Sequence, residues 1–207
     1  MIKRRRKKLR IGVYAGAFDP VHAGHIAFAL QALKAARLDQ VVFVPERRPR
    51  AKPGVEHFGH RVAMLKTALA PHPNLAVLEM VERQFTVART LPGLQAIFPG
   101  AELVFLMGSD AVLSLPAWRH ADRMMGQCEF VIGLRSSLWR PELERSIRAW
   151  NPRLDNVSIV PSYAPDVSSS DIRQALRTNQ EAKGLLSSVQ RYARREWLYV
   201  APAYQLA

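Results

Sequence analysis

The stretch Arg10-Ile-Gly-Val-Tyr-Ala-Gly-Ala-Phe-Asp-Pro-Val-His-Ala-Gly-His25 decides how the rest of the chain is interpreted. Its apolar residues from Ile11 to Ala15 are typical of a short buried strand. Gly16 and the Asp19-Pro20 pair interrupt this run, and apolar residues resume at helical spacing from Ile26 onward. The stretch therefore predicts a strand, a turn and a helix in direct succession.

Two histidines stand at the expected start of this helix. His22 and His25 are three residues apart, so their side chains share one helix face, and Gly24 beside them lets a ligand approach the backbone. A helix start also offers unpaired N–H groups and a positive dipole end, which favour phosphate. The pair could act as general acid and base, donate to phosphate oxygens, or simply be exposed surface histidines. Two ligands are too few for a metal, so we predict no metal site.

The two commonest glycine-rich phosphate motifs are missing from the chain. No Gly-x-Gly-x-x-Gly follows a predicted strand, and no Gly-Lys-Ser/Thr is present. This argues against a dinucleotide fingerprint and against a P-loop.

Strand and helix patterns alternate along the whole chain. Further strands are expected at 41–44, 75–80, 102–107, 130–132 and 157–160, and helices at 22–37, 58–70, 86–98, 141–150, 168–177 and 187–197. We expect the helix at 86–98 to be weakened or kinked at Pro92-Gly93. This order predicts a single doubly wound α/β domain with a mostly parallel sheet and helices on both faces.

The chain of 207 residues is strongly basic, with a net charge of +13 and a pI near 10.7. Part of the excess lies in a run from Lys3 to Arg10. We expect residues 1–9 to form a solvated, disordered tail, with a nucleic-acid or membrane anchor as the alternative, and residues 10–207 to form the domain. The remaining basic body suits an anionic substrate.

Apolar runs and cysteine content point to the cytoplasm as the default compartment. No segment approaches ~20 consecutive apolar residues, so no membrane span is expected. Gly16, Asp19 and His22 interrupt the apolar stretch after the basic run, so no signal peptide is expected. Cys128 is the single cysteine, which excludes an intrachain disulfide and a multi-cysteine metal site. Its apolar neighbours indicate that it is buried.

Residues Gly16 to His25 resemble the Gly-x-Phe-Asp-Pro-x-His-x-Gly-His motif of the nucleotidyltransferases that share a histidine-x-glycine-histidine site. The segment from Val167 to Arg173 resembles a second motif of these enzymes, Ile-Ser-Ser-Thr-x-Ile-Arg. Read without the resemblance, Ser168 or Ser170 can cap a helix, and Arg173 one turn later brings a permanent positive charge suited to phosphate. The alternative for this segment is an ordinary capped surface helix.

A third segment, from Gly108 to Trp118, resembles the Gly-x-Asp…Trp segment of bacterial nicotinate mononucleotide adenylyltransferases. The resemblance implies that Asp110 contacts nucleotide and that Trp118 stacks on the pyridine ring, which an indole face can do. A helix-capping aspartate and a core tryptophan are the alternatives. Phe85-Thr86 resembles the Ser-Tyr-Thr segment of the same family, whose threonine lies beside the nicotinate.

Three positions depart from the family pattern. Ala15 stands where a second glycine is usual, and Gln84 replaces the usual serine. The loop after the second strand is usually Pro-Pro-His-Lys, and here it reads Pro49-Arg-Ala-Lys52. These differences bear on the acceptor more than on adenylyl transfer. The loop also holds Arg47, Arg48 and Arg50, which with Lys52 could close over the triphosphate or the acceptor phosphate.

The resemblance implies a Rossmann-like adenylyltransferase of NAD biosynthesis that joins ATP to nicotinate mononucleotide and releases pyrophosphate. Mg²⁺ is expected on the ATP phosphates. The alternatives are nicotinamide mononucleotide or another phosphorylated acceptor and, more remotely, a non-catalytic nucleotide or nucleic-acid binder. The implied catalytic residues are His22, His25 and Arg173. The implied ATP-binding residues are Gly16, Ala17, Phe18, His22, Gly24, His25, Gly108, Asp110, Ser168, Ser169, Ser170 and Arg173, and the implied substrate-binding residues are Lys52, Thr86 and Trp118.

Overall fold

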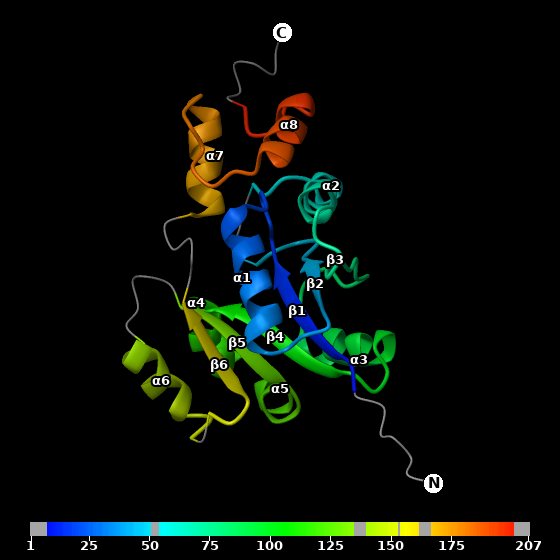
Figure 1. Cartoon of the computed structure of the whole chain (residues 1–207), viewed down its shortest axis with the longest axis vertical. Helices are drawn as coiled ribbons and strands as arrows, with labels where there is room; N and C mark the ends of the chain where they lie inside the picture. Colours follow the sequence, from blue (N-terminus) through cyan, green and yellow to red (C-terminus); the bar gives the residue numbers. More distant parts are fainter. Residues whose placement is uncertain (1–7, 51–53, 135–139, 153, 162–166, 201–207) are drawn as a thin grey trace.

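Six strands form one sheet in the computed structural model, which describes residues 8–50, 54–134, 140–152, 154–161 and 167–200 (Figure 1). The strands follow the order β3-β2-β1-β4-β5-β6, and every neighbouring pair is parallel. Their bounds are β1 Arg10–Gly16, β2 Gln40–Pro45, β3 Leu75–Val77, β4 Glu102–Gly108, β5 Glu129–Leu134 and β6 Val157–Pro161. Such a sheet needs a covering layer on both faces.

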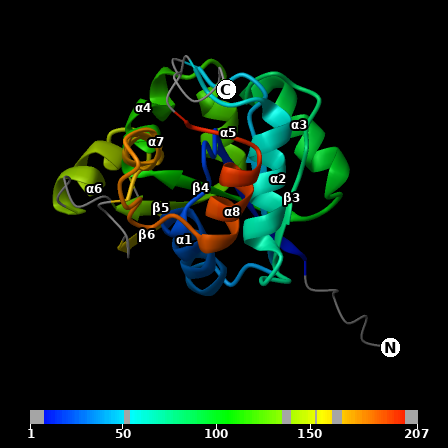
Figure 2. The ribbon, with the colours of Figure 1, turned by 90° about the horizontal axis from the view of Figure 1, so that it is seen from above.

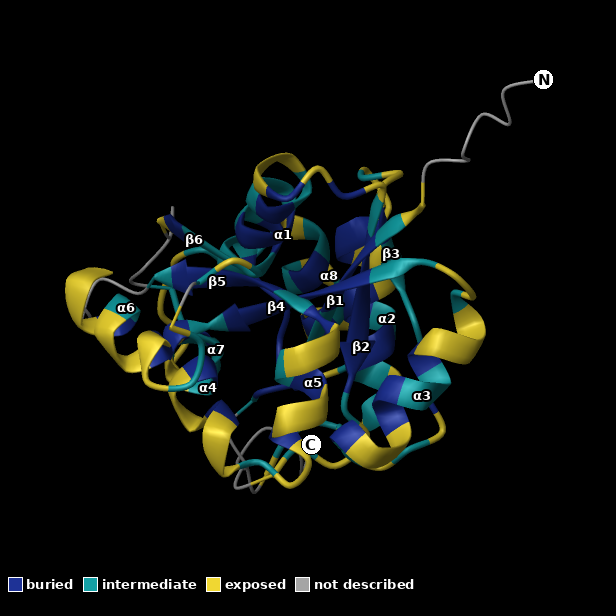
Figure 3. Cartoon of the chain, turned by 90° about the horizontal axis from the view of Figure 1, so that it is seen from below, coloured by how far each residue is buried: buried dark blue, intermediate teal, exposed yellow. Residues whose placement is uncertain are grey.

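Helices provide that covering on each side of the sheet (Figures 2 and 3). Helices α1 (Ala23–Ala35), α2 (Phe58–Leu69) and α8 (Ser187–Arg195) contribute to one core with Val41 and Phe43 of the sheet. Helices α3 (Val87–Ile97), α4 (Ser109–Ser114), α5 (Ala121–Gln127) and α6 (Arg140–Arg148) contribute to the other with Val13 and Val42. Two further elements are η1, Leu115–Ala117, and α7, Ser169–Arg177. Alternate strand residues thus serve opposite cores.

The predicted α/β class is confirmed, and the described strand pairs are all parallel rather than mostly so. One strand differs from the sequence-based expectation: the third strand ends at Val77 instead of residue 80. Helix α3 runs from Val87 to Ile97 with Pro92 inside it, near the predicted bounds. The carbonyl that loses its helical partner at Pro92 belongs to Ala88, which is exposed. Helices α4 and α5, between β4 and β5, had not been predicted.

Strands β2 and β3 are added on one side of β1, and β4, β5 and β6 on its other side, so the strand order reverses between the neighbours β1 and β4. In open parallel sheets, ligands bind beyond the carboxyl ends of the strands at such a switch point. The turn after β1 leads to His22 and to His25 in the first turn of α1, and β4 ends at Gly108, directly before α4 with Asp110. The topology therefore brings the first and third sequence motifs to the same edge of the sheet.

Candidate active site

His22 and His25 lie where the turn after β1 enters α1, and His25 belongs to the first turn of that helix. His22 is the N-cap of α1 and is buried, and the two imidazole rings stack with centroids 3.7 Å apart. The backbone N–H of His22 donates to Nδ1 of His25 across 3.2 Å. The two side chains share one face, as their spacing predicted.

The hydrogen bond to His25 determines which nitrogen of that ring can donate. A neutral imidazole carries one ring proton, and a nitrogen that accepts a hydrogen bond does not hold it. The proton of neutral His25 therefore sits on Nε2. An N–H group at a helix start is suited to a phosphate oxygen.

Aromatic side chains surround the His25 ring. Phe18 lies edge-on to His25 with ring centroids 5.1 Å apart, and Tyr14 lies 5.9 Å from His25. Phe18 itself has a φ of 50°, which is uncommon for a residue with a side chain. Its ring also packs on Tyr14 and Phe43 and is only 2% exposed, so tertiary packing holds this backbone conformation.

Arg61 of α2 fixes the backbone of the same turn and was missed by the sequence analysis. Its guanidinium is fully buried and donates to the carbonyl of Ala17 across 2.6 Å. It also donates to the carbonyls of Glu46, Arg47 and Glu56. Burial lowers the pKa of Arg61. One buried cation thus joins the turn after β1 to the loop after β2, and a lone arginine in a helix gives no local sequence signal for this role.

Helix α7 docks against the turn through its serine-rich start. Ser168 is the N-cap and accepts from the backbone N–H of Asp171 across 3.1 Å, which settles the choice between Ser168 and Ser170. The hydroxyl of Ser169 donates to the carbonyl of Pro20 across 3.0 Å. The second motif therefore contacts the first directly.

Asp19 links Arg173 to the C-terminal part of the described chain. Nη1 of Arg173 donates to the Asp19 carbonyl across 2.7 Å and lies 3.7 Å from Oδ2 of the same residue. Nη2 of Arg173 reaches the hydroxyl of Ser170 at 3.3 Å. The buried Tyr199 hydroxyl donates to Oδ1 of Asp19 across 2.6 Å, and burial raises the pKa of Tyr199, so this phenol stays protonated. No sequence motif had pointed to Tyr199.

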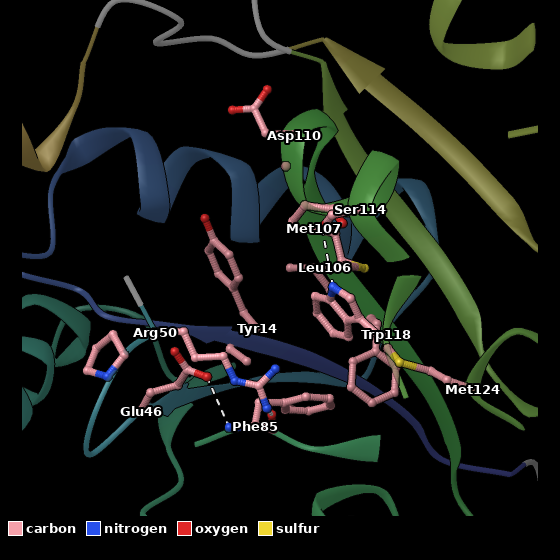
Figure 4. A pocket seen from close by; sticks show the side chains of 15 residues that line it. Tyr14, Glu46, Arg50, Phe85, Leu106, Met107, Asp110, Ser114, Trp118 and Met124 are labelled. Carbon is pink, nitrogen blue, oxygen red and sulfur yellow. Dashed lines mark hydrogen bonds between the residues drawn. The ribbon is translucent and has the colours of Figure 1, made fainter. Parts of the chain in front are cut away.

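A cavity of about 500 Å³ opens near the end of β1, where Tyr14 and Ala15 line it (Figure 4). Trp118 and Phe85 form aromatic walls with ring centroids 6.1 Å apart, and Tyr14 lines it from β1. The indole Nε1 of Trp118 donates to the hydroxyl of Ser114 across 3.2 Å, which holds the ring in place. Asp110 lines the same cavity from α4. This geometry suits a flat aromatic ligand that also carries charge.

Comparisons with known proteins show which family the chain resembles. The Cytidylyltransferase-like family matches residues 13–175. The chain is 32% identical to the "Probable nicotinate-nucleotide adenylyltransferase" of Thermoanaerobacter sp. (strain X514), over 93% of this chain and 95% of that protein. It is also 32% identical to the protein of the same name from Bordetella petrii, over 92% and 98% of the two chains. The chain belongs to the Cytidylyltransferase-like family of nucleotidyltransferases.

A solved structure of a nucleotidyltransferase has the same fold as this chain. Plasmodium falciparum nicotinic acid mononucleotide adenylyltransferase, complexed with NaAD, matches with a TM-score of 0.77. The match covers 92% of this chain and 97% of that chain at 17% sequence identity, so it supports the fold. The Rossmann-like architecture predicted from the sequence is thus confirmed.

Most of the predicted nucleotidyltransferase site residues come together in space. Seven of them cluster around the turn after β1: Gly16 at the end of β1, Ala17, Phe18 and His22 in the turn, His25 at the start of α1, and Ser169 and Arg173 of the docked α7. Gly24 is the second residue of α1, and Ser168 and Ser170 belong to the start of α7. Gly108, Asp110 and Trp118 line the aromatic cavity.

Two predicted substrate residues have different positions. Thr86 lines an adjoining cavity of about 970 Å³, which shares Arg50, Phe85 and Trp118 with the first. Its Oγ1 is buried and has no hydrogen-bond partner among the described residues. Lys52 lies outside the described residues, so its predicted role stays a prediction.

The described part of the chain contains no group of three or more His, Cys, Asp or Glu side chains that could hold a metal ion. Within the same ranges, no helix combines the length and apolar character that a membrane span requires.

Proposed function

We propose that this protein is a nicotinate-nucleotide adenylyltransferase of NAD biosynthesis. It transfers the adenylyl group of ATP to nicotinate mononucleotide and yields nicotinate adenine dinucleotide and pyrophosphate. The observation that carries the proposal is the direct contact between the two motifs, in which Arg173 donates to Asp19 three residues before His22. Tyr14, whose ring centroid lies 5.9 Å from that of His25, lines the aromatic cavity. The two features together offer a triphosphate site beside a pyridine site.

The reaction is an in-line displacement at phosphorus. A phosphate oxygen of the mononucleotide attacks the α-phosphorus of ATP, and the bond between that phosphorus and the bridging oxygen of pyrophosphate breaks. The electron pair and the developing charge leave with pyrophosphate. The nucleophile is already anionic, so the protein mainly positions the reactants and stabilises the shifting charge.

The residues divide this work between them. His25 donates its Nε2–H to an α- or β-phosphate oxygen, and His22 holds the adjacent oxygen from the same face. Arg173 supplies a positive charge for the β- and γ-phosphates, and its contacts with Asp19 and Ser170 orient it. Trp118 and Phe85 receive the pyridine ring, which directs the mononucleotide phosphate toward the histidines.

Mg²⁺ supplies additional charge neutralisation when it accompanies ATP. Such an ion would be held chiefly by phosphate oxygens and water. We place the reaction in the cytoplasm, where ATP is available.

A panel of acceptors tests the proposed function. Purified protein is incubated with ATP, Mg²⁺ and one of nicotinate mononucleotide, nicotinamide mononucleotide, phosphopantetheine or cytidine monophosphate, and pyrophosphate release is measured. We expect the highest kcat/KM with nicotinate mononucleotide. Pyrophosphate release with none of the pyridine nucleotides would contradict the proposal.

A further inference from the structure

Of the described residues that line the aromatic cavity, Arg50 alone carries a positive charge. The other charged groups there are the carboxylates of Glu46 and Asp110. Glu46 accepts from the backbone N–H of Phe85 across 3.0 Å, so its charge is directed to the backbone. An anionic group on a ligand in this cavity therefore has Arg50 as its natural partner.

The guanidinium of Arg50 is held in place at the aromatic end of the cavity. Its Nε donates to Oε1 of Gln84 across 3.1 Å, and its Nη2 reaches the carbonyl of Phe85 at 3.4 Å. Nη1 of Arg50 donates no hydrogen bond to the described residues, which leaves its N–H groups available to a ligand. Figure 4 shows the guanidinium beside the Phe85 ring.

The neighbouring arginines of the loop are turned elsewhere. Arg47 donates to the carbonyl of Met80 across 3.0 Å and stacks on Phe58, with its guanidinium carbon 4.3 Å from the ring centroid. Arg48 lines the adjoining cavity and is absent from the lining of the aromatic one. Arg50 and Gln84 are also two of the positions at which the sequence departs from the family pattern. The departures thus form one contacting pair rather than two separate changes.

We propose that Arg50, positioned by Gln84, determines acceptor specificity by pairing with the ring carboxylate of nicotinate mononucleotide. This inference rests on the proposed function. The acceptor phosphate must reach the α-phosphorus beside His22 and His25, so the group that meets Arg50 at the Phe85 end is the ring substituent. A guanidinium pairs with a carboxylate through charge and parallel hydrogen bonds, and a neutral carboxamide gains neither in full. The acid is therefore preferred over the amide.

The phosphate of the acceptor is also an oxyanion that Arg50 could bind. Comparing an acceptor with a ring carboxylate and one with a ring carboxamide shows which of the two groups Arg50 contacts. We would measure kcat/KM for nicotinate and nicotinamide mononucleotide in the wild type, Arg50→Gln and Gln84→Ala. Arg191→Gln is the matched control, because it removes one exposed positive charge on α8, away from both cavities.

We expect Arg50→Gln to lower kcat/KM for the nicotinate substrate roughly tenfold, mainly through KM, and to leave the nicotinamide value within about twofold. Gln84→Ala should raise KM for the nicotinate substrate by a smaller factor, and the control should match the wild type. Equal losses for both acceptors would assign Arg50 to the phosphate and overturn the inference. An unchanged ratio and unchanged rates in Arg50→Gln would overturn it as well. If the wild type acts on neither acceptor, the proposed function itself is wrong and this inference falls with it.

Discussion

Arg61 shows how a residue outside the recognised motifs can hold a site together. Its buried guanidinium donates to four carbonyls, those of Ala17, Glu46, Arg47 and Glu56. These carbonyls belong to the loops after β1 and β2, which border the proposed phosphate and acceptor sites. Without Arg61 these carbonyls would lose a hydrogen-bond donor, so the residue matters for both stability and site geometry.

Replacing Arg61 by Met should therefore destabilise the protein strongly. The buried Ala17 carbonyl and its neighbours lose their donor, and we expect the free energy of unfolding to fall by roughly 3 kcal/mol or more. Urea unfolding followed by circular dichroism measures this. Arg191→Met, an exposed change on α8, should stay within about 0.5 kcal/mol of the wild type. Equal stability of the two variants would contradict the assigned role.

The histidine pair allows a second prediction for single residues. His25→Ala removes the Nε2–H donor, and we expect kcat to fall by ~10²–10³ with the fold retained. His22→Ala should behave similarly. His72→Ala is the control, because His72 lies in the turn before β3, at the opposite edge of the sheet. Near wild-type turnover in the His22 or His25 variant would show that the pair does not stabilise the transition state.

Among the elements, α7 and the segment after α8 both converge on the turn after β1. Ser169 and Arg173 approach it from α7, and Tyr199 approaches it from beyond α8. Asp19 is 1% exposed and receives contacts from both. The last part of the described chain thus contributes to the geometry of the first motif.

Removing the Tyr199 hydroxyl tests this connection. Tyr199→Phe leaves Oδ1 of Asp19 with the longer contact to the backbone N–H of Glu56, at 3.4 Å. A hydrogen bond to a charged group is worth about 1.5–3 kcal/mol, so the free energy of unfolding should fall by roughly that amount. We also expect a higher KM for ATP, because Asp19 orients Arg173. A variant with unchanged stability and unchanged KM would argue against the link.

The sequence predicted the elements well where periodicity was strong and less well where tertiary contacts decide. Strands and long helices followed from apolar patterns, and the His22–His25 pair followed from its spacing. Helices α4 and α5 were missed because they have only six and seven residues, too few for a clear period. Arg61, Tyr199 and the Arg50–Gln84 contact join residues far apart in the chain, and no local pattern encodes such pairings.

For the whole molecule, Cys128 reports on global unfolding. Its side chain is buried in the core against α5 and β5, and burial raises its pKa to about 12. We expect no reaction with a thiol reagent at pH 8 under native conditions and rapid reaction once the protein unfolds. Reaction of the folded protein at the rate of a free thiol would contradict this.

The raised pKa of Cys128 also predicts how the stability of the protein depends on pH. The thiol pKa is higher in the folded state than its ordinary value of 9.0, so the stabilising contribution is complete below pH 9 and is lost as the pH rises toward 12. Burial of Tyr199 acts in the same direction. The denaturant midpoint should therefore decrease above about pH 9, and less steeply in Cys128→Ala.

Adenylyl transfer requires attack on the α-phosphorus of ATP, and labelled ATP tests this most directly. Protein, Mg²⁺ and nicotinate mononucleotide are incubated with ATP labelled with ³²P at either the α- or the γ-position, and the products are separated. We predict that the α-label appears in nicotinate adenine dinucleotide and the γ-label in pyrophosphate, with neither formed when the acceptor is omitted. An α-label that remains in ADP or AMP, or a γ-label that appears in the acceptor or in inorganic phosphate, would contradict adenylyl transfer at this site.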